Sequence, residues 1–104
     1  MLEISSIDDP KGLRLVGEVD LATVERFRSA LAPLVREGGE IVLDIGDMRF
    51  IDSSGAQVLI RALEDLSHRG RLVLAHPRRM VISMVRVMGL QRFENLEVQE
   101  DASS

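Results

Sequence analysis

Ile41-Val42-Leu43-Asp44-Ile45 leads, through the short link 46–51, to Asp52-Ser53-Ser54-Gly55, and this stretch decides how the chain folds. The near-continuous apolar run is typical of a strand that is covered on both faces of a sheet. After the glycine, apolar residues recur at helical spacing and predict a helix from about Ser54 to His68, closed by Gly70: Ala56, Leu59, Ile60, Leu63 and Leu66. The sequence therefore predicts a strand-to-helix junction that carries a carboxylate, two hydroxyls and a glycine.

The chemistry of this junction allows two interpretations. The first N–H groups of a helix have no partner within the helix, and the helix dipole favours negative charge there. A phosphate added to a serine at this point would therefore be well accommodated. Ser and Asp are also common helix N-caps, and Ser54 with Gln57 fits the S-x-x-Q capping box. From these residues alone, simple capping is the favoured interpretation.

Periodicity and turn residues predict the other elements. Pro33 predicts a kink or a shortened last turn in the first helix, and Pro77 suits the first turn of the third. The predicted segments are a strand over 2–7, a turn over 8–12, a strand over 13–18, a helix over 21–37 ended by Gly38-Gly39, a strand over 72–75, a helix over 79–88 ended by Gly89, and a last strand around 95–98.

The predicted order of elements is β-β-α-β-α-β-α-β, within one domain over residues 1–104. Strands that alternate with helices predict an α/β fold with a mixed sheet of about five strands, covered by helices. The sheet is expected to be parallel in its later part, with an antiparallel edge from the first hairpin. Sites in such sheets lie at the carboxyl ends of the strands, which is where the junction at Asp52 falls.

Composition excludes several classes of function. No apolar stretch approaches the roughly 20 residues that a membrane span needs, and no signal-peptide pattern is visible. The chain has no Cys, and together these absences favour a cytoplasmic protein that does not bind membranes. A net charge of -4 argues against direct nucleic-acid binding, and three Phe as the only aromatic residues offer no stacking platform for single strands.

The residues give little support to catalysis or to a metal centre. The flanks of Ser54 do not form the Gly-x-Ser-x-Gly nucleophile elbow, and no general base is evident nearby. His68 and His76 are isolated, and without Cys they make no metal site. Lys11, the only lysine, belongs to no phosphate-binding loop. We therefore expect a protein that is not an enzyme and that needs no cofactor.

The order of elements and two motifs resemble the STAS domain, and within it the bacterial anti-sigma factor antagonists. The motifs are Gly17-Glu18-Val19-Asp20 after the second strand and Met48-Arg49-Phe50-Ile51-Asp52-Ser53-Ser54-Gly55 after the third. The match runs from about Leu13 to Leu96. The resemblance implies that Ser54, rather than Ser53, is a phosphorylated serine, and it outweighs the capping interpretation.

The resemblance also implies partners and a mechanism. The unphosphorylated protein would bind an anti-sigma factor that is itself a serine kinase and so free a sigma factor. Phosphorylation would end that binding, and a PP2C-type phosphatase would reset it. The expected partner-binding residues are Asp20, Asp52, Ser53, Ser54 and Gly55.

Alternatives remain open for several of these residues. Asp20 could instead be the N-cap of the first helix, with Thr23 at N3. Gly55 could give a partner close access, because it has no Cβ, or it could only meet a turn requirement. The alternative function is an accessory STAS subunit of a transport or signalling assembly, without a serine switch. A small hydrolase that uses Ser54 is the contrasting class.

The end of the chain departs from the family pattern. The resemblance implies a further long C-terminal helix, which is lacking here, since only Gln99–Ser104 follows the last predicted strand. The third helix is unusually apolar, with only Arg79, Ser83 and Arg86 as a polar stripe. We expect part of it to be exposed and to contribute to a homodimer or a second partner contact. The alternative is that Leu90, Phe93 and Leu96 fold back over it.

Overall fold

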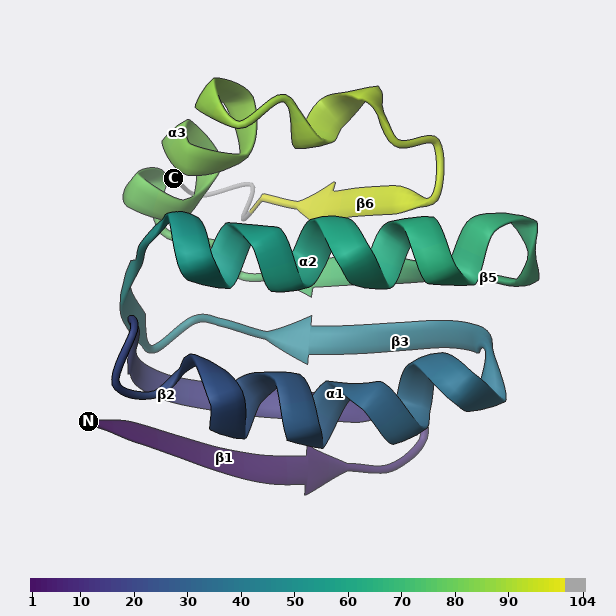
Figure 1. Cartoon of the computed structure of the whole chain (residues 1–104), viewed down its shortest axis with the longest axis horizontal. Helices are drawn as coiled ribbons and strands as arrows, with labels where there is room; N and C mark the ends of the chain where they lie inside the picture. Colours follow the sequence, from purple (N-terminus) through teal and green to yellow (C-terminus); the bar gives the residue numbers. More distant parts are fainter. Residues whose placement is uncertain (101–104) are drawn as a thin grey trace.

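A computed structural model describes residues 1–100 and shows a mixed sheet with three α-helices (Figure 1). The strands run in the order β1-β2-β3-β5-β6, and β4 pairs with β2 beside this path. Only the β1–β2 pair is antiparallel, as predicted from the first hairpin. The elements are β1 (Leu2–Ile7), β2 (Gly12–Val19), α1 (Val24–Glu37), β3 (Gly39–Asp44), β4 (Met48–Ile51), α2 (Ser53–Leu66), the 3-10 turn η1 (Ser67–Arg69), β5 (Gly70–Ala75), α3 (Arg79–Val87), the 3-10 turn η2 (Leu90–Arg92) and β6 (Leu96–Gln99).

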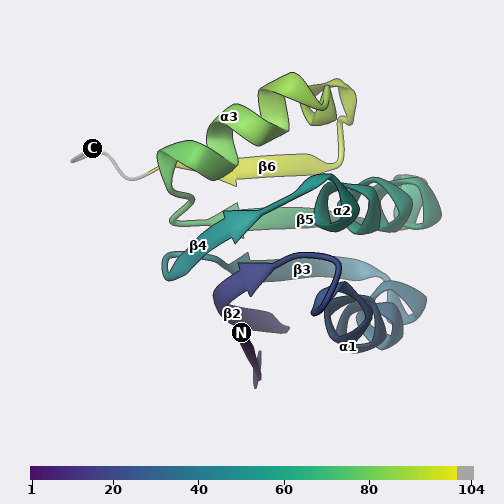
Figure 2. The ribbon, with the colours of Figure 1, turned by 60° about the vertical axis from the view of Figure 1, so that its left-hand side comes forward.

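The core lies between the sheet and the helices. Figure 2 shows α1 and α2 side by side on one face of the sheet, with α3 beside β6. Alternate residues of β2 point into this core, so Leu13, Leu15 and Val19 are buried while Arg14 is exposed. Phe27 of α1 is completely buried against them. The inward-facing alternate residues of the strands therefore pack against the apolar faces of the helices at one interface.

The prediction that 41–45 is covered on both faces is wrong. Ile41 and Leu43 are buried, but Val42 and Asp44 of the same strand are only half-buried. At β3 the second face of the sheet carries polar side chains, and the Arg14 guanidinium lies 3.9 Å from Asp44 and 2.6 Å from Asp47. Val73 and Ala75 of β5, the register partners of Val42 and Asp44, are buried, so this face is only partly exposed to solvent.

β4 is an element that the sequence did not predict, since 46–51 was expected to be a link. The strand is short, and a register shift between Gly17 and Glu18 interrupts its parallel pairing with β2. Neighbours of β2 change along its length, because residues 12–14 pair with β3 and residues 17–19 pair with β4. The sheet therefore has six strands rather than about five.

The helix boundaries differ from the predicted ones at several points. α2 ends at Leu66 with Ser67 as its C-cap, so the predicted end at His68, closed by Gly70, is wrong. α1 begins at Val24, and Leu21 lies in the preceding turn. The helix continues through Pro33 to Glu37, so its last turn is not shortened, and Gly38 caps it at a φ of 77° as expected. Pro77 precedes the first residue of α3, Arg79, and so lies outside that helix.

The apolar surface of α3 is covered in part and exposed in part, as expected. Val81 and Val85 are buried, and the η2 turn that follows brings Leu90 into the core with no exposed area. Of the large apolar side chains of α3, Met80 is 36% exposed and Val87 is 83% exposed. Leu90 thus folds back over α3, as the alternative required. The homodimer remains a prediction. Residues 101–104, on which most of the expectation about the chain end depends, lie outside the described residues.

Asn95 links the end of α2 to the start of the last strand pair. Its amide nitrogen lies 3.0 Å from the carbonyl oxygens of Leu63 and Ser67 and 3.2 Å from that of Gly70. The Leu63 carbonyl also accepts from the backbone N–H of Ser67, so Asn95 adds a side-chain donor where α2 ends and β5 begins.

We predict that Asn95→Ala lowers the free energy of unfolding by about 1–3 kcal/mol, because it removes a donor from half-buried carbonyl groups. Urea denaturation measures this change. Gln91→Ala is the matched control, because Gln91 is exposed and its side chain forms no hydrogen bond within residues 1–100. Equal stability of the two variants would contradict the capping role of Asn95.

Candidate functional site

Asp52 is the N-cap of α2, directly after β4. Its Oδ1 accepts hydrogen bonds from the backbone N–H groups of Ser54 at 2.9 Å and Gly55 at 3.3 Å. The predicted capping box with Ser54 as the cap is therefore wrong, since the helix begins one residue earlier, at Ser53. A carboxylate in this position satisfies two unpaired donors and faces the positive end of the helix dipole.

The same carboxylate holds the hydroxyl group of Ser54. Ser54 Oγ donates to Asp52 Oδ1 at 2.5 Å, and the side chain is half-buried, whereas Ser53 is exposed. The Ser54 hydroxyl, followed by the two backbone N–H groups, lowers the pKa of Asp52 below its usual range, although partial burial opposes this effect. Asp52 thus stays ionised and orients one specific serine of the pair.

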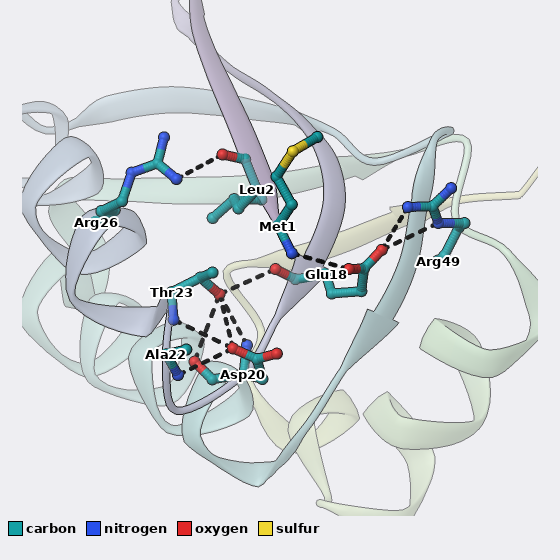
Figure 3. A network of polar contacts seen from close by, with 8 residues as sticks. All are labelled: Met1, Leu2, Glu18, Asp20, Ala22, Thr23, Arg26 and Arg49. Atoms are coloured by element: carbon teal, nitrogen blue, oxygen red, sulfur yellow. Dashed lines mark hydrogen bonds and ion pairs between the residues drawn. The ribbon is translucent and has the colours of Figure 1, made fainter.

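Asp20 organises the turn between β2 and α1 and caps the start of that helix. Its Oδ1 accepts from the N–H groups of Ala22 at 2.9 Å and Thr23 at 3.2 Å. Thr23 Oγ1 donates to the carbonyl oxygen of Glu18 at 2.9 Å (Figure 3). The regular helix begins at Val24, after Thr23, and the Thr23 side chain does not cap it. The capping contacts come from Asp20, as the alternative proposed: its N–H donates to Thr23 Oγ1 at 3.0 Å, and its carbonyl oxygen accepts from the N–H of Val24 at 2.8 Å.

Strand pairing brings Asp20 and Asp52 to one edge of the sheet. Val19 of β2 is the register partner of Ile51 of β4, and each aspartate is the next residue. The backbone N–H of Asp52 donates to the carbonyl oxygen of Val19 at 3.1 Å, which extends the pairing by one step. We call Asp20, Asp52, Ser53 and Ser54 the switch edge. It carries two carboxylates and two serine hydroxyls.

Gly55 is needed for packing inside the molecule, not for access from outside. It is buried, and a Cβ built on it would lie 2.5 Å from Cγ1 of Ile51 and 2.8 Å from Cγ1 of Val19. Both explanations offered from the sequence, open access for a partner and a turn requirement, miss this reason. The first turn of α2 sits so close to β2 and β4 that only a glycine fits.

An ion-pair network ties β4 to β2 next to the switch edge. Arg49 donates to Oε2 of Glu18 from Nε at 3.1 Å and from Nη2 at 2.5 Å, and the amine of Met1 lies 3.0 Å from Oε1 (Figure 3). Arg49, followed by the amine, lowers the pKa of the Glu18 carboxyl. Sequence analysis could not find this network, because its members are far apart in the chain.

Two exposed apolar side chains flank the switch edge and were missed by sequence analysis. Leu21, next to Asp20, is 81% exposed, and Phe50, on β4, is 42% exposed. Leu21 fitted the helical spacing of the α1 core and so looked buried. The one available signal was Asp20, a preferred N-cap residue, which places Leu21 in the capping turn and not in the buried stripe of α1.

Within the described residues, no group of acidic and histidine side chains could hold a metal ion. His68 lies in η1, at the opposite end of α2 from Ser54. His76 follows β5, at the carboxyl edge of the sheet. Across residues 1–100, none of the helices is both long and apolar enough to pass through a bilayer.

We predict that Asp52→Ala lowers the free energy of unfolding by about 1 kcal/mol at pH 7, the usual cost of losing an N-cap. The folded pKa of Asp52 lies below its ordinary value of 3.8, so the stabilising effect is full above that value. It disappears as the pH falls through the lower, folded pKa. Urea denaturation of wild type and variant over a pH series measures both effects.

Asp52→Asn is the control for this experiment, because asparagine keeps a capping oxygen but has no charge to titrate. It should lose less stability than Asp52→Ala at pH 7. A difference between wild type and Asp52→Ala that is absent at pH 7, or that grows in acid, would contradict the role assigned to Asp52.

Solved structures share this fold at low sequence identity. The unphosphorylated anti-sigma factor antagonist SpoIIAA superposes with a TM-score of 0.70 at 20% identity, over 99% of this chain and 91% of that one. An anti-sigma factor antagonist from Mycobacterium paratuberculosis gives 0.74 at 19% identity, over 93% and 84%. A putative anti-sigma factor antagonist from Thermotoga maritima gives 0.74 at 20% identity, over 98% and 88%.

A family model also matches almost the whole sequence. The model describes the STAS domain, and its match spans residues 1–102, which includes every strand, every helix and the switch edge. Together with the six-stranded mixed sheet, this match confirms the resemblance drawn from the two motifs. The chain belongs to the STAS domain family.

Proposed function

We propose that this protein is an anti-sigma factor antagonist that acts by partner switching. Its unphosphorylated form binds an anti-sigma factor with serine kinase activity, which frees a sigma factor in the cytoplasm. Phosphorylation of Ser54 ends the binding, and a PP2C-type phosphatase restores it. Membership of the STAS family and the fold shared with anti-sigma factor antagonists support this proposal.

The observation that carries the proposal is the position of the Ser54 hydroxyl. It lies in the first turn of α2, at an edge that already holds Asp20 and Asp52. A phosphate brings a charge of roughly -1.5 to -2 and three strong acceptor oxygens. Asp52 already occupies the N–H groups of Ser54 and Gly55, so the phosphate must compete for them or remain solvated.

The added charge acts on an interface more than on the fold. A partner that packs dry against the switch edge would have to bury an uncompensated dianion beside two carboxylates, which costs several kcal/mol. The fold itself is protected, because the helix dipole favours negative charge in the first turn by about 0.3–1 kcal/mol. Affinity for the partner therefore falls while the protein stays folded.

Exposed apolar side chains beside the switch edge supply the attraction that the acidic groups do not. Leu21 and Phe50 flank Asp20 and Asp52 in the sequence and point at least partly into solvent. Large apolar side chains at the centre of an interface commonly carry much of its binding energy. The role requires a binding surface and a phosphate acceptor, and it requires no catalysis by this chain.

We predict that incubation with ATP and the cognate kinase places one phosphate on the tryptic peptide that spans residues 50–61. Ser54 is the acceptor, because Asp52 orients its hydroxyl whereas Ser53 has no such partner. Mass spectrometry of wild type, Ser53→Ala and Ser54→Ala identifies the residue. A phosphate retained in Ser54→Ala and lost in Ser53→Ala would overturn the assignment.

We also predict that Ser54→Asp binds the anti-sigma factor at least about tenfold more weakly than wild type, a change of about 1.4 kcal/mol. Aspartate carries less charge than a phosphate, so the effect is partial. Ser54→Ala should bind and resist inactivation by ATP. Isothermal titration calorimetry measures the affinities, and thermal denaturation checks that both variants are folded. Wild-type affinity in Ser54→Asp would contradict the electrostatic mechanism.

A further inference from the structure

A groove with a basic rim is lined by residues of α1, α2 and η1. In Figure 1, α1 and α2 lie in front of the sheet. We call it the arginine groove and define it by Arg28 and Arg36 of α1 and by Arg61 and Arg69, which belong to α2 and η1. Its volume is about 830 Å³, and Asp65 is its one acidic lining residue. The proposed switch does not use this surface.

The charge of the groove is opposite to that of the whole chain. The sequence has 17 acidic and 13 basic residues, yet four arginines gather around this one depression. Like charges that lie close together repel one another, so a cluster of arginines lowers the stability of the fold unless opposite charge balances it. An anionic occupant would do so.

Two of the four guanidinium groups are unengaged. Arg28 pairs with Glu25, and Arg69 donates to the backbone carbonyl of Asp65 at 2.8 Å. The side chains of Arg36 and Arg61 form no hydrogen bond or ion pair with any residue between 1 and 100, and both are exposed. A guanidinium group presents donors in a planar fork that matches a carboxylate.

The groove is long and its floor is closed. Arg28 and Arg36 are eight positions apart in α1, which corresponds to about 12 Å along the helix axis, or about two helical turns. The floor residues Leu31, Val35, Val58 and Ala62 are each less than a tenth exposed. Charge, rather than burial of a large apolar surface, must therefore provide most of the attraction.

We propose that the arginine groove binds an acidic segment of a partner protein, with its carboxylates on Arg36 and Arg61. A bilayer is a poorer occupant, because none of the five large exposed apolar side chains of residues 1–100 lines the groove. Nucleic acid is also a poorer occupant, because no aromatic residue lines it to stack a base. A helical segment about two turns long matches the groove in length and in charge.

The probe is a fluorescent synthetic peptide of about 12 residues. Its central two helical turns, about 12 Å, carry glutamates that flank leucines at helical spacing. Fluorescence anisotropy at low salt measures its affinity for the protein. Arg36→Gln/Arg61→Gln should weaken binding about tenfold. Arg79→Gln/Arg86→Gln is the matched control. It removes the same amount of positive charge, but from α3. Arg86 lies in the last turn of α3, just as Arg36 lies in the last turn of α1.

The expected result is peptide binding that is lost in the groove variant and kept in the control, with no binding of the same peptide carrying lysine for glutamate. Amide shifts of the unmodified protein should map to α1 and α2, so the proposal stays testable if the variant is unstable. Equal loss in both variants, or shifts outside the groove, would overturn it. Tighter groove-dependent binding of oligothymidylate or phosphatidylglycerol vesicles would overturn it in favour of those ligands. Because Ser54 is unchanged throughout, failure here leaves the switch untouched.

Discussion

The parallel pairing of β4 with the second half of β2 decides where the functional residues lie. Val19 and Ile51 are register partners, and this pairing delivers Asp20 and Asp52 to the same edge of the sheet. It also determines how closely α2 packs on the sheet. The first turn of α2 lies so near the side chains of Val19 and Ile51 that there is no space for a Cβ at position 55. The edge would lose its geometry if β4 were only a loop. The Glu18–Arg49 ion pair helps to keep the strand in place.

A single oxygen atom of Asp52 serves both the fold and the proposed switch. Oδ1 caps α2 and accepts the hydroxyl hydrogen of Ser54, so the residue that starts the helix also selects the serine. The proposed phosphorylation would remove that hydroxyl donor and set a dianion beside the carboxylate. Both changes concern groups at a helix start, where partial exposure and the helix dipole limit their cost to the fold. Such a design lets chemistry at one atom change binding without dismantling the domain.

Much of this could be predicted from the sequence, and the failures have physical causes. The hairpin, the three helices and the strand-to-helix junction follow from periodicity and from Gly38 and Gly89, which are local signals; Gly70 begins β5 and does not end α2. β4 was missed because it is short and because a register shift replaces the alternation that marks a strand. Leu21 was misplaced because one residue can match helical spacing by chance. The packing role of Gly55 depends on Val19, 36 positions away in the chain, which no local pattern reports.

The central claim is that phosphate on Ser54 changes charge at one edge and leaves the fold intact. A comparison of 1H–15N spectra of the phosphorylated and unphosphorylated protein tests it most directly. The account predicts that shift changes are confined to the turn after β2, to β4 and to the first turns of α2, with amides of β3, β5 and β6 unmoved. Shift changes spread across the sheet, or collapse of the spectrum toward that of an unfolded chain, would contradict it.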